Sequence, residues 1–396
     1  MSAVEALEDR TLLSTFTVNT TADTVDVDPG DGVAEDSNGD TSLRAAVMEA
    51  DGLAGQEVEI VLPGGTYVLG GALHFNAGAN VSLVGESATT SIIDGGGVDR
   101  VAVVHGQATA HFESMTIRNG VTQGRGGGIL NRGDLTVVSV QISNNVSGQD
   151  GGGIAVEAGD LTIHSSAIVS NNVGSGSSQG RAIAALMVSA SVRLYDTTVS
   201  GNGDYGSQGG GAAISAFSDS SIEILSSTIT HNSGNGLAAN SGAVFMSNSL
   251  FAGNNAVDID GNVDSGGGNL IGVWDANQFS VLAPSDQAGS NGSPLDPMLG
   301  PLQDNGGPTP THALLAGSPA IDAGRSYGAT TTDQRGIARP QDGNGDGTAA
   351  VDIGAYEWIE NAPPTLDEIA APEPITESSG QQTISLAGIT GGIGES

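Results

Sequence analysis

Four side chains of types that support proton transfer occur in one repeated stretch of the sequence: His164, Arg193, Tyr195 and Glu223. A His or Tyr side chain can abstract a proton when it is held beside the reacting atom. An Arg next to such a base can neutralise the carboxylate of an acidic sugar. These four residues are therefore candidates for a catalytic site, if the fold brings them onto one surface.

The repeat that relates these residues consists of five similar segments. They read DLTVVSVQISNN from Asp134, DLTIHSSAIVSNN from Asp160, SVRLYDTTVSGN from Ser191, SIEILSSTITHN from Ser221 and AVFMSNSLFAGN from Ala243. Their last residues are Asn145, Asn172, Asn202, Asn232 and Asn254, which lie 22 to 30 residues apart. Repeats of about 20 to 50 residues stack into solenoids. The sequence therefore predicts one long coil of short structural units.

Each unit contains a short strand with one buried face. Apolar and polar residues alternate, as at Leu161 and Ile163, and this period of two is typical of such strands. Glycine-rich corners at 126–128 and 151–153 separate the units. Since there is no room for crossover helices, strands of successive coils must pair in parallel. We predict an all-β parallel β-helix; disordered low-complexity sequence and a β-sandwich or propeller are the alternatives.

Stacking the coils predicts which residues share a surface. The third positions of four units hold Thr136, Thr162, Arg193 and Glu223, and the fifth positions hold Val138, His164, Tyr195 and Leu225. His111 and Glu113 fall near the same ladders one coil earlier. Coils about 4.8 Å apart would place the candidates on one outward face. The opposing interpretation is an ordinary solvated face in which Arg193 and Glu223 form a cross-strand pair.

The composition limits the partners and the compartment. The chain of 396 residues has 62 Gly, 4% aromatic residues, no Lys, no Cys and a formal net charge of −34. Nucleic acids and anionic membrane surfaces would be repelled by this charge. The sequence also excludes disulfides and thiolate metal sites, and it has no apolar stretch of about 18 residues that predicts a transmembrane helix.

The N-terminal region is predicted to consist of a segment resembling an export motif, which is not an ordinary signal peptide, followed by a cap. In residues 16–57 a strand precedes a short helix that Thr41 or Ser42 can cap, and this helix can cover the first coil of residues 58–300. The helix start TSLRAAV resembles the CSLREA domain, with Thr41 where that family often has Cys. Within residues 1–15, Val4–Ser14 resembles a motif at the start of exported bacterial surface proteins.

Two further resemblances concern the coils and the C-terminal region. The strands of Val58–Gly120, with the corner IIDGGG, resemble right-handed β-helices of the pectate-lyase type. The C-terminal region resembles the end of the choice-of-anchor Q family of bacterial surface proteins. The segments that carry this resemblance are Asp296–Gly300, Asp304–Pro310, Ser318–Gly324, Asp333–Pro340 and Asp352–Glu357. We expect residues 301–360 to form an irregular cap over the last coil. Residues 361–396 resemble a linker and the start of an Ig- or cadherin-like repeat, which predicts further C-terminal domains.

A calcium site is predicted in the run DGNGDGTAAVD. Asp342, Asn344 and Asp346 occupy the first, third and fifth places of an EF-hand-like loop, where oxygen side chains converge on a hard cation. The twelfth place holds Ile353, and the nearest acid is Asp352. A turn held by its own Asp and Asn side chains is the competing interpretation. Bound calcium would stiffen the C-terminal cap.

The functional hypothesis is a non-catalytic extracellular or cell-surface module of the scaffold or adhesion type. Its partners would be polysaccharides or other cell-surface components, bound on the long face. The alternative is a lyase or hydrolase acting on acidic polysaccharide through His164, Arg193, Tyr195 and Glu223. Against the alternative, the sequence contains no Lys for a lyase-type base, and the Gly-His-Gly and Arg-Ile-Lys motifs of related glycosidases do not occur.

Overall fold

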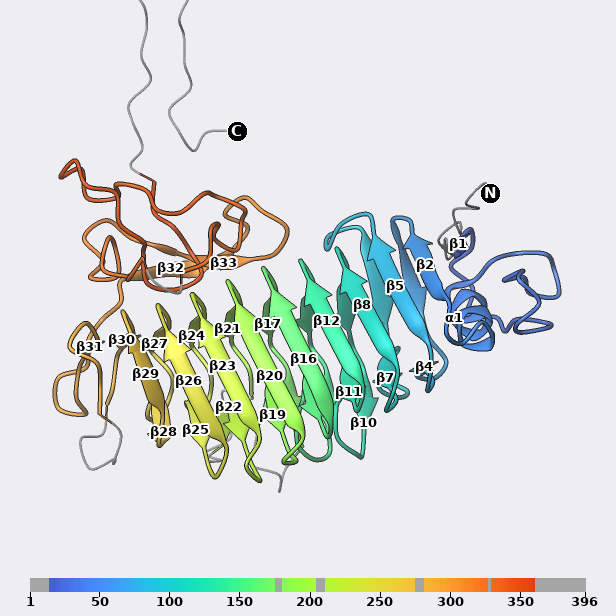
Figure 1. Cartoon of the computed structure of the whole chain (residues 1–396), viewed down its shortest axis with the longest axis horizontal. Helices are drawn as coiled ribbons and strands as arrows, with labels where there is room; N and C mark the ends of the chain where they lie inside the picture. The colour runs from blue at the N-terminus through green and yellow to red at the C-terminus, as the bar shows by residue number, and fades with distance from the viewer. Residues whose placement is uncertain (1–13, 175–179, 204–210, 275–280, 327–328, 360–396) are drawn as a thin grey trace, which may run out of the picture.

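The computed structural model describes residues 14–174, 180–203, 211–274, 281–326 and 329–359. The main body is a parallel β-helix whose coils follow one another along the long axis of the molecule (Figure 1). Each regular coil contributes one strand to each of three parallel sheets, which we call A, B and C. The parallel β-helix predicted from the repeats is therefore confirmed. The export-like motif and the Ig-like repeat predicted at the two ends lie outside the described residues, apart from Ser14.

The three long sheets share the same coil order. Sheet A contains β1 (Ser14–Thr17), β2 (Glu57–Leu62), β5 (Asn80–Gly85), β8 (Thr109–Glu113), β12 (Asp134–Val138), β16 (Gly159–His164), β20 (Ala190–Tyr195), β23 (Ser221–Leu225), β26 (Ala243–Ser247) and β29 (Asp264–Gly267). Sheet B contains β3 (Gly65–Val68), β6 (Ser91–Asp94), β9 (Thr116–Arg118), β13 (Gln141–Ser143), β17 (Ala167–Val169), β21 (Thr198–Ser200), β24 (Thr228–Thr230), β27 (Leu250–Ala252), β30 (Leu270–Ile271) and β31 (Gln287–Ala288). Sheet C contains β4 (Leu73–Phe75), β7 (Ala102–Val104), β11 (Ile129–Asn131), β15 (Ile154–Val156), β19 (Ile183–Ala185), β22 (Ala212–Ala216), β25 (Asn235–Ala239) and β28 (Ile259–Gly261). A small sheet D joins β10 (Val121–Thr122), β14 (Val146–Ser147) and β18 (Asn172–Val173).

Stacked aliphatic side chains fill the interior of the β-helix. In sheet A, Leu161 and Ile163 pair with Val192 and Leu194 of the next coil, and all four side chains are buried. Burying one such side chain stabilises the fold by about 1.5–3 kcal/mol. The alternation seen in the sequence thus fixes which residues of sheet A face outward.

A ladder of buried asparagines stabilises the corner that follows sheet B. In the last four members of the ladder, Oδ1 accepts hydrogen bonds from the backbone N–H and the side-chain Nδ2 of the Asn one coil earlier, at 2.9–3.1 Å. Its members are Asn145, Asn171, Asn202, Asn232 and Asn254. The alignment of Asn172 was wrong, because the Asn-Asn pair is displaced by one residue between the first two units. Asn172 instead lies in β18.

Hydroxyl groups form a second ladder at the corner between sheets A and B. The residue that makes the turn has a positive φ of 46° to 51° in four successive coils: Ser165, Asp196, Ser226 and Asn248. The next residue carries a hydroxyl group, and Thr197 N–H donates to Ser227 Oγ at 3.2 Å while Ser227 N–H donates to Ser249 Oγ at 3.2 Å. These bonds satisfy backbone groups that the turn removes from the sheets.

The glycine-rich corners are required by close backbone contacts. Gly126 has φ +69°, and a Cβ there would lie 2.4 Å from the carbonyl oxygen of Ile129. One coil later Gly151 has φ +72°, with the corresponding distance to Ile154 being 2.5 Å. A larger residue would be strained at either position and would displace the next strand of sheet C.

The N-terminal helix covers the first coils, as predicted. It is α1 (Leu43–Gly52), and Ser42 caps it by accepting a hydrogen bond from Ala45 N–H at 3.0 Å. Leu43 and Val47 join the main core, while the guanidinium of Arg44 pairs with Asp23 at 2.7 Å. Among the described residues, no helix is long and apolar enough to cross a membrane.

The C-terminal segment, residues 299–359, does not lie over the last coil, where we expected it. It contains the antiparallel hairpin of β32 (Leu299–Gln303) and β33 (Thr311–Leu314), and it lies along the side of the β-helix rather than over its last coil (Figure 1). Trp274 and Leu282, which precede this segment, pack against the last part of the main core instead. The segment covers part of the outer face of sheet B, as its contacts show.

Apolar packing and hydrogen bonds join the C-terminal segment to sheet B. Leu250, Ala252 and Leu270 of sheet B form a buried cluster with Leu314, Ala320 and Ile353 of the segment. Toward the middle of the β-helix, polar contacts replace this cluster. Thr198 Oγ1 donates to Gln334 Oε1 at 2.6 Å, and Ser200 Oγ lies 2.8 Å from Nε2 of His312. The C-terminal segment therefore covers this part of the outer face of sheet B.

Candidate functional site

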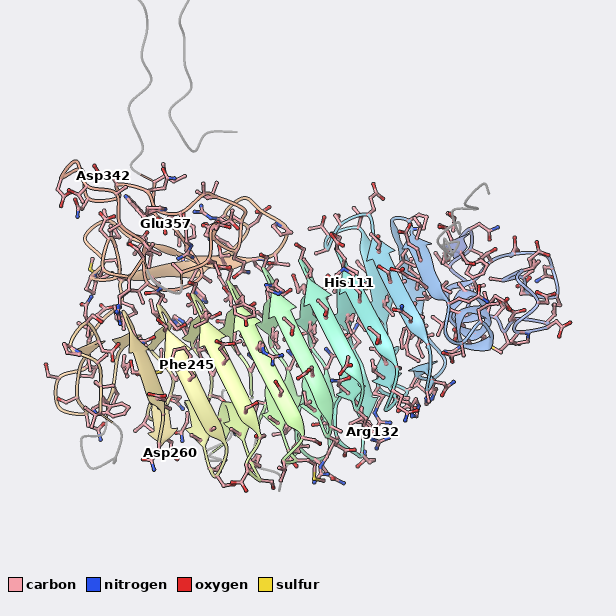
Figure 2. The ribbon with its side chains drawn as sticks, in the orientation of Figure 1. His111, Arg132, Phe245, Asp260, Asp342 and Glu357 are labelled. Carbon is pink, nitrogen blue, oxygen red and sulfur yellow. The ribbon has the colours of Figure 1, made fainter. Side chains whose placement is uncertain are left out.

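The outer face of sheet A brings the four predicted site residues together. His164 pairs with Tyr195 in the register between β16 and β20, and Arg193 pairs with Glu223 between β20 and β23. The predicted ladders are therefore correct, and β8 places His111 one coil before Thr136. This face carries no part of the C-terminal segment in the view of Figure 2, where Phe245 and His111 both lie on it.

His164 and Tyr195 form a stacked pair of rings. Their centroids are 4.8 Å apart and their planes differ by 15°. The phenol of Tyr195 donates a hydrogen bond to Glu223 Oε2 at 2.9 Å. Burial and this carboxylate raise the pKa of Tyr195 to about 12, whereas burial lowers the pKa of His164. The Tyr195 phenol is consequently protonated and the His164 ring neutral near pH 7.

Arg193 is already paired with carboxylates from both neighbouring strands. Its guanidinium lies 3.5 Å from Asp160 and 4.0 Å from Glu223. These pairs are partly exposed, so each contributes little to stability. Both hold the guanidinium against the sheet, however, and they balance its charge locally. The cross-strand pair proposed for Arg193 and Glu223 is present.

The site extends to Phe245 and Asp264, which the sequence analysis did not single out. Phe245 continues the ladder after Glu223, and Asp264 follows it on β29. Phe245 as a residue is 36% exposed, and its ring lies close to Gly266, where an added Cβ would be 2.6 Å from the ring. The aligned segment from Ala243 could have revealed Phe245, because its third position falls in the same ladder.

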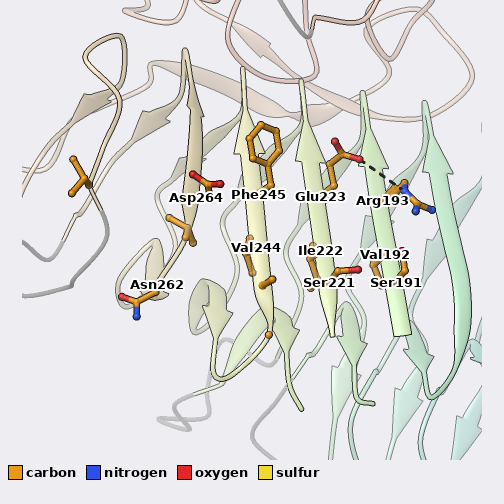
Figure 3. Close-up of a pocket in the computed structure, with 14 residues that line it drawn as sticks. Ser191, Val192, Arg193, Ser221, Ile222, Glu223, Val244, Phe245, Asn262 and Asp264 are labelled. Atoms are coloured by element: carbon orange, nitrogen blue, oxygen red, sulfur yellow. Dashed lines mark ion pairs between the residues drawn. The ribbon is translucent and has the colours of Figure 1, made fainter. Parts of the chain in front are cut away.

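A shallow groove is lined by Arg193, Glu223, Phe245 and Asp264. It has a volume of about 820 Å³ and crosses β20, β23, β26 and β29. Figure 3 shows Phe245 between Glu223 and Asp264, with the ion pair from Arg193 to Glu223 at one side. The groove combines one aromatic surface with several hydrogen-bonding groups. Such a combination suits a polar ligand that also has an apolar face.

The predicted calcium loop forms a compact turn. Asp342 accepts three backbone hydrogen bonds at 2.8–3.2 Å, Asn344 accepts one from Asp346, and Asp346 accepts one from Thr348. Both oxygens of Asp352 accept backbone hydrogen bonds elsewhere in the segment. Within the described ranges, no three His, Cys, Asp or Glu side chains come together as a metal-binding group. Calcium at Asp342, Asn344 and Asp346 stays a prediction.

A buried charge cluster lies where the C-terminal segment meets the β-helix. The Arg339 guanidinium is 3.6 Å from both Asp196 of the β-helix and Glu357 of the segment. Burial raises the pKa of Asp196 to about 7 and also raises the pKa of Asp352 to about 7. These groups are inaccessible to a large ligand, so we assign the cluster to the attachment of the segment.

Comparison with known proteins supports the fold. No family model matches the chain, and no curated protein sequence matches it. Among solved structures, the crystal structure of pectate lyase Pel9A is similar, with a TM-score of 0.51 and 15% identity; the match covers 88% of this chain and 98% of that chain. The predicted right-handed, pectate-lyase-like β-helix is confirmed. The resemblances to the choice-of-anchor Q and CSLREA families remain predictions.

Proposed function

We propose that this protein is a non-catalytic β-helix module of the cell exterior that binds polysaccharide on sheet A. The groove around Phe245 carries this proposal. An exposed aromatic ring can pack against the apolar face of a sugar, while Arg193 and Glu223 can hydrogen-bond to its hydroxyl groups. Successive strands about 4.8 Å apart continue the polar surface along the face. A long chain of sugars therefore suits this surface better than a small molecule.

The chemistry of the four candidate residues favours binding over catalysis. A tyrosine base must lose its proton near the working pH, whereas Tyr195 has a pKa of about 12 and donates to Glu223. Arg193, which would have to neutralise a substrate carboxylate, already contacts two carboxylates of the protein. His164 could act as a base, but its ring is stacked on Tyr195. The contacts among the four residues therefore favour binding over proton transfer.

A lyase or hydrolase acting on acidic polysaccharide is the second candidate. Pel9A is a pectate lyase, and its similarity in fold is the observation that favours this activity. Fold alone does not determine function. The position of a module outside the cell, as a scaffold or an adhesion surface, rests on the same fold and on the acidic, cysteine-free composition.

The two candidates are separated by measuring binding and turnover on the same samples. We would screen the protein on a glycan array and incubate it with pectin, alginate and neutral polysaccharides. We expect binding that Phe245→Ala abolishes, with no unsaturated or reducing ends released. The control variant is Val98→Ala, which removes an exposed apolar side chain outside the groove. New sugar ends that disappear in His164→Ala would contradict the proposal, and so would an array without binding.

A further inference from the structure

Carboxylates outnumber the basic groups on the outer face of sheet A. The outward carboxylates on its ten strands are Glu57, Glu59, Glu113, Asp134, Asp160, Glu223 and Asp264. Arg193 is the one arginine in these strands, and their two histidines are His111 and His164. The strands are all described by the structure, so this charge balance is complete for the sheet. A negative surface of this size attracts cations and repels polyanions.

The few basic groups on this face do not reverse its charge. Arg193 is shared between Asp160 and Glu223. His111 Nε2 lies 3.1 Å from Glu113. His164 is stacked on Tyr195, and its environment favours the neutral ring. A polyuronate placed here would bring its carboxylates against those of the protein, with no uncompensated cation in these strands to receive them.

We infer that the sheet A groove selects a polysaccharide carrying protonated amino groups, such as an amino-sugar chain with free amines; this inference rests on the glycan-binding function proposed above. Glu223, Phe245 and Asp264 occupy consecutive strands of one ladder. The two acids therefore lie on opposite sides of the ring, roughly 10 Å apart at about 4.8 Å per strand. A cationic sugar on the ring can meet a carboxylate on either side.

Two interactions would then act on the same sugar. The ammonium groups would form charge-assisted hydrogen bonds with Asp264 and with Oε1 of Glu223, since Tyr195 and Arg193 contact the other oxygen, Oε2. The ring of Phe245 would contact the sugar face and attract the neighbouring positive charge. The net charge of −34 adds a long-range attraction that salt weakens. A polycation attracted only by the net charge would not need the Phe245 ring. Binding in the groove is therefore distinguished by its loss in the Phe245→Ala variant.

The test compares three oligosaccharides of equal length: glucosamine oligomers, their N-acetylated counterparts and oligogalacturonate. Calorimetry below the pKa of the amine should give a Kd for glucosamine oligomers at least about tenfold lower than for the acetylated ones. Oligogalacturonate should not bind. Asp264→Asn and Glu223→Gln should each reduce this difference, whereas Asp304→Asn, in an exposed turn of the C-terminal segment, should leave it unchanged.

Other outcomes overturn the inference in distinguishable ways. If neutral oligomers bind equally well and Phe245→Ala weakens them, the proposed function holds and the selectivity for amines is wrong. Tighter binding of oligogalacturonate also contradicts the inference. If polylysine competes fully and Phe245→Ala has no effect, the attraction is nonspecific and the inference fails. Absence of binding to all oligosaccharides would remove both the inference and the proposed function.

Discussion

Sheets A and B belong to the same coils, yet one is open and the other is partly covered. Where the C-terminal segment covers sheet B, the outward residues are hydroxyl-bearing or aliphatic, as at Thr198, Ser200 and Leu250, and the segment contacts each of them. Outward residues of sheet A include Arg193 and Phe245, which line a groove. The protein therefore uses one face for its own stability and leaves the other available to a partner.

The two faces also handle buried charge differently. On sheet A the charged groups are partly exposed, so water screens them and the face tolerates many carboxylates. Where the C-terminal segment meets the β-helix, Arg339 is fully buried with Asp196 and Glu357. A change on sheet A should therefore alter binding, whereas a change beneath the segment should alter stability.

The largest effect is expected from a change in the buried core, which supports both sheet A and sheet B. Ile224→Asp places a charge in the completely buried core shared by the coils. We expect a loss of several kcal/mol in the free energy of unfolding, because the carboxylate has no partner there. Thermal unfolding followed by circular dichroism measures this loss, and Ile163→Asp should behave alike. Unchanged melting, or a mainly helical spectrum of the parent protein, would contradict the fold.

A smaller and local effect is expected from Arg339→Ala. The change leaves the ionised forms of Asp196 and Glu357 buried without their cation, and breaking a buried ion pair costs about 3–5 kcal/mol. The C-terminal segment should become sensitive to protease while the coils stay folded and sheet A keeps its glycan binding. Arg132→Ala, which breaks an exposed pair with Glu157, is the control. Equal protease resistance of both variants would refute the attachment role.

The pH dependence of this attachment follows from its acids. Since burial raises the pKa of Asp196 and of Asp352 to about 7, their protonated forms favour the folded segment. Their contribution is complete below the ordinary carboxyl pKa of about 4 and is lost as the pH rises toward 7. His312 opposes them, because burial lowers its pKa to about 4 and its contribution falls on acidification.

Asp196→Asn separates these contributions. The amide removes one titrating acid, so stability should decrease less between pH 6 and pH 8 than in the parent protein. Above pH 6.5 the histidine is mostly neutral in both states and the acids dominate the slope. Melting temperatures across this interval provide the measurement. An identical slope in parent and variant would show that Asp196 does not titrate in this range.

The smallest effect concerns the predicted calcium loop. We propose that calcium at Asp342, Asn344 and Asp346 stiffens the C-terminal segment without reaching sheet A. Calorimetry should detect binding in the millimolar class, with a modest rise in melting temperature on adding calcium. Asp342→Ala combined with Asp346→Ala should remove both signals. If the double variant and the parent give the same heats, the loop is a turn held by its own side chains.

The sequence predicted the coils well because their pattern is local. Alternation around Leu161 and Ile163 determined the inward face, and the strand register placed His164 beside Tyr195. The Asn ladder was misaligned at Asn172, since adjacent asparagines gave two possible registers. Only the structure distinguishes them through the bonds of Asn171.

The position of the C-terminal segment could not be predicted in the same way. Thr198 and Gln334 are 136 residues apart in sequence, and neither belongs to a recognisable pattern with the other. Thr198 alone reads as an ordinary outward residue of a strand. The same limit applies to the charge cluster, because the partners of Asp196 come from the distant segment.

Hydroxyl-radical footprinting of the protein with and without a bound oligosaccharide shows directly which face of the β-helix the ligand covers. We expect that Phe245, which lines the groove, and Tyr195, which is hydrogen-bonded to Glu223 of the groove, lose reactivity when the oligosaccharide binds. Leu315, an exposed residue of the C-terminal segment, should react equally in both samples. Protection confined to the C-terminal segment, with Phe245 and Tyr195 unchanged, would contradict the assignment of sheet A as the binding face.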